Sequence, residues 1–186
     1  MAGCDNCGPG EHSTDVPEGT LRIALAGNPN TGKSSIFNSL TGAKQHVGNW
    51  PGKTVARAHG TFHHDGRDYE VVDLPGIYSL NAESPEEIIA RDYLVSGEPD
   101  VVVIVVDATN LERNLYLVVQ ILETGVPAIL DLNMMDVAAS RGITIDVDEI
   151  SKLLGVPVVT SVARSAKGLN DLKDVIAGVV AWQGTV

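Results

Sequence analysis

The segment from Gly27 to Ser34 runs Gly-Asn-Pro-Asn-Thr-Gly-Lys-Ser and fits the pattern of two glycines five positions apart followed by lysine and a hydroxyl residue. It follows a predicted strand, Leu21–Ala26, and opens a predicted helix, Gly32–Leu40. There, backbone N–H groups and the helix N-terminus can surround phosphates, the lysine can reach the β and γ phosphates of a nucleotide, and the hydroxyl can ligate Mg²⁺. The sequence therefore predicts a phosphate-binding loop, with contacts expected from Gly27, Asn28, Asn30, Thr31, Gly32, Lys33, Ser34 and Ser35.

A second motif, Asp73-Leu74-Pro75-Gly76, ends another apolar strand and begins 46 positions after Gly27. Ligand-binding loops of open α/β sheets emerge at such strand ends. Asp73 can hold Mg²⁺ through water, and Gly76 can offer its N–H to a γ-phosphate. Taken alone, the four residues also describe an ordinary strand-ending aspartate and a Pro-Gly turn, but the spacing favours a nucleotide sensor.

The loop between the first predicted helix and the second predicted strand contains two glycines and a proline, which indicate a mobile segment that a nucleotide can order. Its residues are Gly48, Asn49, Trp50, Pro51, Gly52, Lys53 and Thr54. Thr54 is the candidate for a second hydroxyl ligand to Mg²⁺, the alternative being a surface threonine that starts a strand. Trp50 is equally compatible with a core anchor. We expect Lys33, Thr54 and Gly76 to take part in catalysis.

A third motif, Asn133-Met134-Met135-Asp136, follows the buried strand Ala128–Leu132. The Asp136 carboxylate can accept both hydrogen bonds from the N1–H and N2–H₂ edge of guanine, whereas adenine offers no such pair of donors. Asn133 can bond the base and tie this loop to the phosphate loop. Met134 stands where most GTPases carry lysine, and it keeps the apolar stem without the cation, so we expect guanine selectivity with modest affinity. The last base-contacting loop is expected at Ser161, Val162 and Ala163.

Composition limits the other functions. The chain has 186 residues and a net charge of −11, whereas nucleic-acid binders of this size carry a basic face. No apolar run approaches the ~20 residues of a membrane helix, and no signal peptide is apparent, so we expect a soluble, cytosolic chain. Residues 1–19 are rich in Gly, Asp, Glu and Pro and are expected to form a flexible tail, followed by one domain at 20–186.

The elements alternate between strand and helix, which predicts an α/β fold with right-handed crossovers. Continuous apolar runs at Val101–Asp107 and Ala128–Leu132 are typical of strands buried on both faces of a mainly parallel sheet. The other expected strands are Ala56–His63, Asp68–Asp73 and Val156–Thr160, and the first two are joined by a hairpin that adds one antiparallel edge strand. Helices are expected on both faces at Pro85–Val95, Leu111–Glu123, Val147–Leu154 and Leu169–Ala181.

These motifs together resemble the N-terminal G domain of the bacterial ferrous-iron transport protein B (FeoB) family, over about Leu21 to Ala181. The resemblance is carried by Gly27-Asn28-Pro29-Asn30 with Ile36-Phe37-Asn38, by Val47 to Gly52, by Ser84-Pro85-Glu86-Glu87 through Arg91 to Leu94, by Asp107 to Leu115, and by Leu132 to Asp136. It implies a Ras-like six-stranded P-loop GTPase fold. It also implies a GTP-operated switch at the cytoplasmic face of the bacterial inner membrane, with GTP and GDP as ligands and the membrane-embedded iron-transport region as partner.

The resemblance further implies that Asn30 and the backbone carbonyls of Gly48 and Trp50 can hold K⁺ near the phosphates. The family's helical domain and transmembrane helices are absent, so we expect either an excised fragment or a short form. The N-terminal Cys4, Cys7 and His12 offer an incomplete site for Fe²⁺ or Zn²⁺, and a solvated, metal-free tail is the favoured alternative. Nothing in the sequence distinguishes a monomer from a homo-oligomer.

Ile77 follows Gly76 where Ras-type enzymes place the glutamine that orients water. We therefore expect slow hydrolysis, on the order of 10⁻⁴–10⁻² s⁻¹, in which K⁺ and backbone groups of the first switch, the loop from Gly48 to Thr54, position the water. Two alternatives stay open. One is a nucleotide-binding interaction module with negligible turnover, and the other is a ribosome-assembly GTPase, which this acidic chain disfavours because such proteins add an RNA-binding module or a basic surface.

Overall fold

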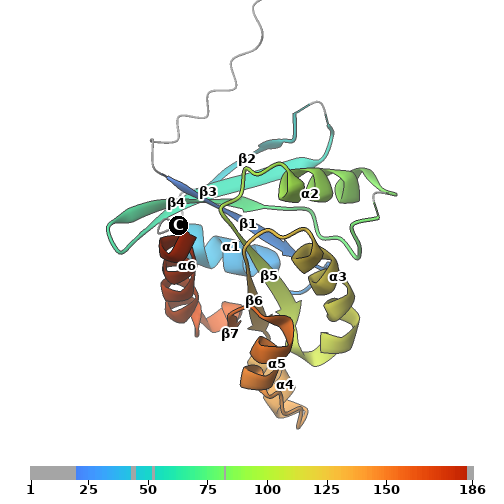
Figure 1. Cartoon of the computed structure of the whole chain (residues 1–186), viewed down its shortest axis with the longest axis vertical. Coiled ribbons are helices and arrows are strands. Elements are labelled where there is room, and N and C mark those ends of the chain that lie inside the picture. Colours follow the sequence, from blue (N-terminus) through green and yellow to red (C-terminus); the bar gives the residue numbers. More distant parts are fainter. Residues whose placement is uncertain (1–19, 43–44, 52, 82, 184–186) are drawn as a thin grey trace, which may run out of the picture.

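The computed structural model describes residues 20–42, 45–51, 53–81 and 83–183, and these form a seven-stranded sheet with helices on both faces (Figure 1). The strands are β1 (Leu21–Gly27), β2 (Gln45–Asn49), β3 (Ala56–His64), β4 (Arg67–Asp73), β5 (Val101–Asp107), β6 (Ala128–Asn133) and β7 (Val158–Thr160). The helices are α1 (Lys33–Thr41), α2 (Pro85–Val95), α3 (Leu111–Glu123), α4 (Met135–Ser140), α5 (Val147–Leu154) and α6 (Leu169–Gln183), with 3₁₀ turns η1 (Ala108–Asn110) and η2 (Ala163–Ser165).

The strand order is β2-β3-β4-β1-β5-β6-β7, and β3 alone runs against its neighbours. The predicted α/β architecture with a mainly parallel sheet is therefore confirmed. Parallel strands need a crossover connection, and helices supply them here. Helix α2 connects β4 to β5, α3 connects β5 to β6, and α4 with α5 connects β6 to β7. Helices α1 and α6 cover one face, while α2 and α3 cover the other (Figure 1).

The prediction of six strands is wrong, because Gln45–Asn49, expected as a loop, forms the edge strand β2. Its sequence, Gln-His-Val-Gly-Asn, lacks apolar alternation, and four of its five residues are exposed. The antiparallel pairing with β3 holds it in the sheet. The hairpin strand β3 is accordingly second from the edge, and the predicted edge strand is corrected to β2.

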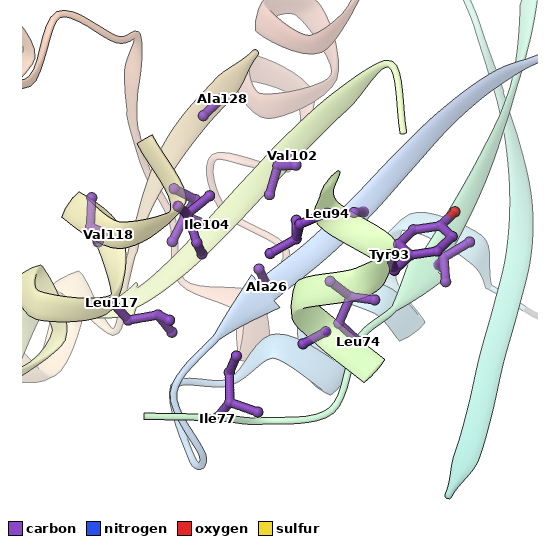
Figure 2. Close-up of a cluster of buried hydrophobic side chains, with 14 of the residues drawn as sticks. Ala26, Leu74, Ile77, Tyr93, Leu94, Val102, Ile104, Leu117, Val118 and Ala128 are labelled. Carbon is purple, nitrogen blue, oxygen red and sulfur yellow. The ribbon is translucent and has the colours of Figure 1, made fainter. Parts of the chain in front are cut away.

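The buried interior lies in two clusters, one on each face of the sheet. Figure 2 shows part of the cluster under α2 and α3, to which Leu74, Ile77, Tyr93 and Leu117 belong. Trp50 is 8% exposed and meets Tyr93 edge-on, with ring centroids 5.3 Å apart, so the tryptophan anchors the first-switch loop to this cluster. Within the described residues, no helix has both the length and the apolar character needed to span a bilayer.

Candidate functional site

The predicted motifs meet at one edge of the sheet. The phosphate loop follows β1, Asp73 ends β4, Asn133 ends β6, and Ser161 follows β7. These four strands are parallel, so their carboxyl ends and the loops after them lie at the same edge. The sheet thereby brings together motifs that are more than 130 positions apart in the chain.

The phosphate loop turns sharply into α1 at Gly32, whose φ is +88°. The N–H groups of Ser35 and Ile36 donate to the Gly32 carbonyl at 2.9 and 3.0 Å and start the helix there. Thr31 is buried, and its hydroxyl donates to the Asn28 carbonyl at 3.0 Å, which fixes the middle of the loop. Asn28 is buried as well, whereas Asn30 is exposed with φ at +66°.

Lys33 and Asp73 form an ion pair at the base of the loop. The Lys33 side chain is 9% exposed, and the Ser34 hydroxyl lies 3.4 Å from the second oxygen of Asp73. A hydroxyl and a carboxylate converging beside a phosphate loop are the hard oxygen donors that Mg²⁺ prefers. Ser34 and Asp73 therefore fit the predicted Mg²⁺ site.

The loop after β4, which carries Gly76 and Ile77, packs on the phosphate loop. A Cβ atom added to Gly76 would lie 3.2 Å from Cα of Pro29, so a larger residue there would press on the phosphate loop. The Ile77 N–H donates to the Gly27 carbonyl at 3.3 Å. The Ile77 side chain is 3% exposed and belongs to the buried cluster with Leu74 and Leu117 (Figure 2), so this position presents no side chain to a water molecule.

Asn133 joins the loop after β6, Asn133 to Asp136 and here called the base loop, to the phosphate loop. Its Nδ2 donates to the Thr31 carbonyl at 2.9 Å, and its Oδ1 accepts the Ala163 N–H at 3.0 Å. The residue is 2% exposed, so both bonds are shielded from water. Beside it lies a cavity of about 190 Å³ lined by Ser35, Asn133, Met134, Asp136, Val137, Val162, Ala163 and Arg164.

Met134 and Asp136 border this cavity from the start of α4. Met134 has φ at +64°, a left-handed conformation that turns the chain between β6 and α4. Asp136 pairs with Arg164, whose Nη2 donates to Oδ2 at 2.8 Å. Arg164 was not among the predicted residues, because an exposed arginine after a run of small residues has no distinguishing pattern.

The first-switch residues lie apart from the phosphate loop. Gly48 and Asn49 are in β2, which two strands separate from β1, and three strand spacings place β2 about 14 Å from β1. Trp50 accepts the Lys53 N–H at 2.9 Å and its own N–H donates to Val55, which closes the loop as a turn. Pro51, Lys53 and Thr54 are exposed.

Among the hydrogen bonds of the described residues, none joins Thr54 to Ser34 or Asp73, or Asn30 to Gly48 or Trp50. Gly52, Cys4, Cys7 and His12 lie outside the described residues.

A further polar residue, Asp131, lies beneath the base loop. It is 0% exposed in β6, and its Oδ2 accepts the Ser161 hydroxyl at 3.0 Å. Burial raises the pKa of Asp131 to about 7, against the opposing effect of the Ser161 hydrogen bond. Sequence reasoning passed over this residue, although a carboxylate in the middle of an apolar strand is a visible departure from the pattern.

Known proteins are similar to this chain in both sequence and fold. The family model described as "Ferrous iron transport protein B" matches residues 21–176. The Fe(2+) transporter FeoB of Salmonella typhimurium is 50% identical over 157 residues, which is 82% of this chain and 20% of the relative. The chain thus spans about a fifth of the length of that curated relative.

Solved structures of FeoB domains also resemble this chain. The G domain of the T. maritima FeoB iron transporter is 45% identical with a TM-score of 0.82, covering 86% of this chain and 98% of that domain. The cytosolic domain of the same transporter in its GMPPNP form is 45% identical with a TM-score of 0.85, covering 87% of this chain and 64% of the other. The chain therefore belongs to the ferrous iron transport protein B family and is an N-terminal G domain of that family.

Proposed function

We propose that this domain binds GTP, hydrolyses it slowly, and acts as a switch that regulates ferrous-iron uptake across the bacterial inner membrane. The observation that best supports this proposal is the 2.9 Å hydrogen bond from Asn133 Nδ2 to the Thr31 carbonyl, which holds the base loop against the phosphate loop. A ligand that spans both loops is a nucleotide, and Asp136 beside the cavity selects guanine.

In this proposal each motif has one task. Backbone N–H groups of the phosphate loop and the Lys33 ammonium hold the β and γ phosphates, and the Gly76 N–H contacts the γ-phosphate. Ser34 and Asp73 would hold Mg²⁺, and Thr54 would join them once the first switch closes. When bound, Mg²⁺ neutralises charge that develops on the phosphate oxygens. Lys33, Thr54 and Gly76 are the proposed catalytic residues.

The burial of Ile77 supports slow turnover. An isoleucine within the core cannot orient water, so hydrolysis depends on backbone groups of the first switch and on the charge near the phosphates. The same observation favours the second candidate, a nucleotide-binding interaction module with negligible turnover. Single-turnover hydrolysis of GTP separates the two, because the switch predicts GDP formation on the order of 10⁻⁴–10⁻² s⁻¹, whereas the interaction module predicts no measurable GDP formation.

We expect K⁺ to accelerate this hydrolysis through Asn30, with the carbonyls of Gly48 and Trp50 as further ligands. A positive charge at this position does what an arginine finger does in other GTPases, a contribution of about 10³–10⁵ in rate at most. The measurement is phosphate release in KCl and in NaCl at equal ionic strength, with Mg²⁺ in both. Asn30→Ala should remove the difference between the two salts, and equal rates for the unmodified domain would contradict the K⁺ site.

The regulatory part of the proposal rests on the length of the relatives. The curated FeoB relative is about four times as long as this chain, and its name describes an Fe(2+) transporter. We propose that the partner of this domain is the membrane-embedded iron-transport region of the same full-length protein. Iron uptake by cells that carry the full-length protein with Lys33→Ala tests this, and uptake at the unmodified rate would exclude a regulatory role.

A further inference from the structure

Asp131 occupies an unusual place for a carboxyl group. It alternates with Leu130 and Leu132 along β6, and so it points to the opposite face of the sheet, the side of α1 and α6. Val105 of β5 and Val159 of β7 flank it in the sheet. Its Oδ2 accepts the Ser161 hydroxyl, whereas its Oδ1 is buried without a hydrogen-bond partner. Burying a carboxylate in this way is costly unless the group becomes neutral.

The Ser161 hydroxyl stands between Asp131 and Asn133. Its Oγ lies 3.0 Å from Asp131 Oδ2 and 3.3 Å from Asn133 Oδ1, and Ser161 is itself 1% exposed. A hydroxyl has one proton to donate, and both neighbours are acceptors when Asp131 is ionised. The Ser161 hydroxyl then donates to the Asp131 carboxylate, because hydrogen bonds to charged groups are stronger. As a result, Ser161 Oγ and Asn133 Oδ1 face each other with no proton between them.

A neutral Asp131 reverses the direction of this chain. Its O–H donates to Ser161 Oγ, and the Ser161 hydroxyl becomes free to donate to Asn133 Oδ1. Asn133 then holds two donors at its oxygen, Ala163 N–H and Ser161 O–H, while its Nδ2 donates to the Thr31 carbonyl. The amide that joins the base loop to the phosphate loop is fixed at both ends.

We propose that Asp131 is a positioning residue of the base pocket, and that guanine nucleotides bind more tightly when its carboxyl is neutral because Ser161 then donates to Asn133. The inference rests on the proposed binding of guanine nucleotides. The pKa of about 7 that burial gives Asp131 places the change between the two arrangements near neutral pH.

The charged groups on the surrounding elements do not account for this shift. They are Lys33 on α1, Asp107 on β5, Asp136 on α4, Arg164 and Lys167 after β7, and Asp171, Lys173 and Asp174 on α6. The pKa of Asp131 is raised by burial and lowered by the Ser161 hydrogen bond, with no charged neighbour among the causes. The titration therefore reports on the buried chain of hydrogen bonds and not on the acidic surface.

The sign of the effect follows from linkage. Below pH 7 the carboxyl is neutral and the favourable arrangement is present, and as the pH rises through 7 the carboxyl ionises and affinity falls. The loss of one net hydrogen bond corresponds to about fivefold in an equilibrium constant. By reciprocity the bound nucleotide raises the titration midpoint of Asp131 by about 0.7 pH unit.

The test is the affinity of a fluorescent GDP at pH 6.0 and pH 8.5, at constant ionic strength and Mg²⁺. Part of the pH dependence of GDP affinity is common to the unmodified domain and Asp131→Asn. Once that part is subtracted, the unmodified domain should bind GDP about fivefold more weakly at pH 8.5 than at pH 6.0. Asp131→Asn places a neutral amide that can donate to Ser161 at every pH, so its own dependence comes only from the nucleotide and the other groups. Glu70→Gln, which changes another buried carboxylate, paired with Arg22, should keep the unmodified profile.

Ser161→Ala provides an independent test of the hydrogen-bond chain from Asp131 to Asn133. It removes the link to Asn133 while leaving the carboxyl in place, so infrared spectra should show Asp131 still titrating while the affinity no longer follows it. The role of Asp131 would be overturned if GDP affinity depended on pH in the same way in the unmodified domain and in Asp131→Asn. It would also be overturned if Glu70→Gln lost the pH dependence as Asp131→Asn does. An unmodified domain that binds no guanine nucleotide at either pH would overturn the proposed function itself.

Discussion

Asp136→Asn is expected to weaken GTP binding by about 100-fold and to turn the preference of the domain toward xanthosine triphosphate. In the proposed base contact the carboxylate accepts two hydrogen bonds from the guanine edge, and an amide replaces one acceptor with a donor that faces another donor. Xanthine carries a carbonyl in place of the 2-amino group, so it restores the match. The measurement is displacement of a fluorescent GDP by GTP and by xanthosine triphosphate.

Two controls isolate the base contact in that experiment. Asp146→Asn makes the same chemical change at the N-cap of α5, where asparagine caps as well as aspartate, and should leave both affinities unchanged. Arg164→Ala removes the contact with Asp136 alone, and because the Arg164 side chain is 82% exposed its loss costs little stability. Unaltered GTP affinity in Asp136→Asn would refute the assignment of Asp136 to the base.

Gly32→Ala is expected to abolish nucleotide binding, by more than about 100-fold, in a domain that remains folded. A Cβ atom at this position would lie 2.2 Å from Nδ2 of Asn133, whose amide is held by Thr31 and Ala163. The φ of +88° is also unfavourable for alanine. The joint between base loop and phosphate loop must therefore open, and two separated loops cannot share one nucleotide. Titration with fluorescent GDP measures the loss, and circular dichroism checks the fold.

The matched control is Gly142→Ala. Gly142 has a similarly positive φ of +71°, but a Cβ atom there would meet nothing within 4 Å. It should cost about 1 kcal/mol of stability through backbone strain and leave nucleotide affinity intact. If Gly32→Ala bound nucleotide as tightly as Gly142→Ala, Asn133 and Gly32 would not form the joint proposed for the site.

Periodic apolar residues made much of the fold predictable. The helices Pro85–Val95, Leu111–Glu123 and Val147–Leu154 and the strand Val101–Asp107 have the predicted bounds. The edge strand β2 was not predictable in this way, because pairing with β3 stabilises it while its own side chains bury almost nothing. The six-residue helix α4 was missed for a related reason, since it is too short to show a period.

The candidate site also has a part that the sequence predicts and a part that it does not. Motif spacing predicted which loops carry Lys33, Asp73 and Asn133, and the parallel strands bring these loops to one edge. Contacts that depend on tertiary packing, such as those of Asp131 with Ser161 and of Arg164 with Asp136, have no counterpart in sequence spacing. They become visible only when β6, β7 and the turn after β7 are placed side by side.

The edge strand β2 gives the domain two regions of very different local stability. The central strands β1 and β5 have a partner on both sides and lie in the two apolar clusters, so their amide protons are exposed only by opening close to the global unfolding free energy. Strand β2 has one partner and almost no buried side chains, so it can separate at a small fraction of that cost. Strand β2 can thus open and re-form while the centre of the domain stays folded, and the buried Trp50 ring that follows it marks where this easily opened region ends.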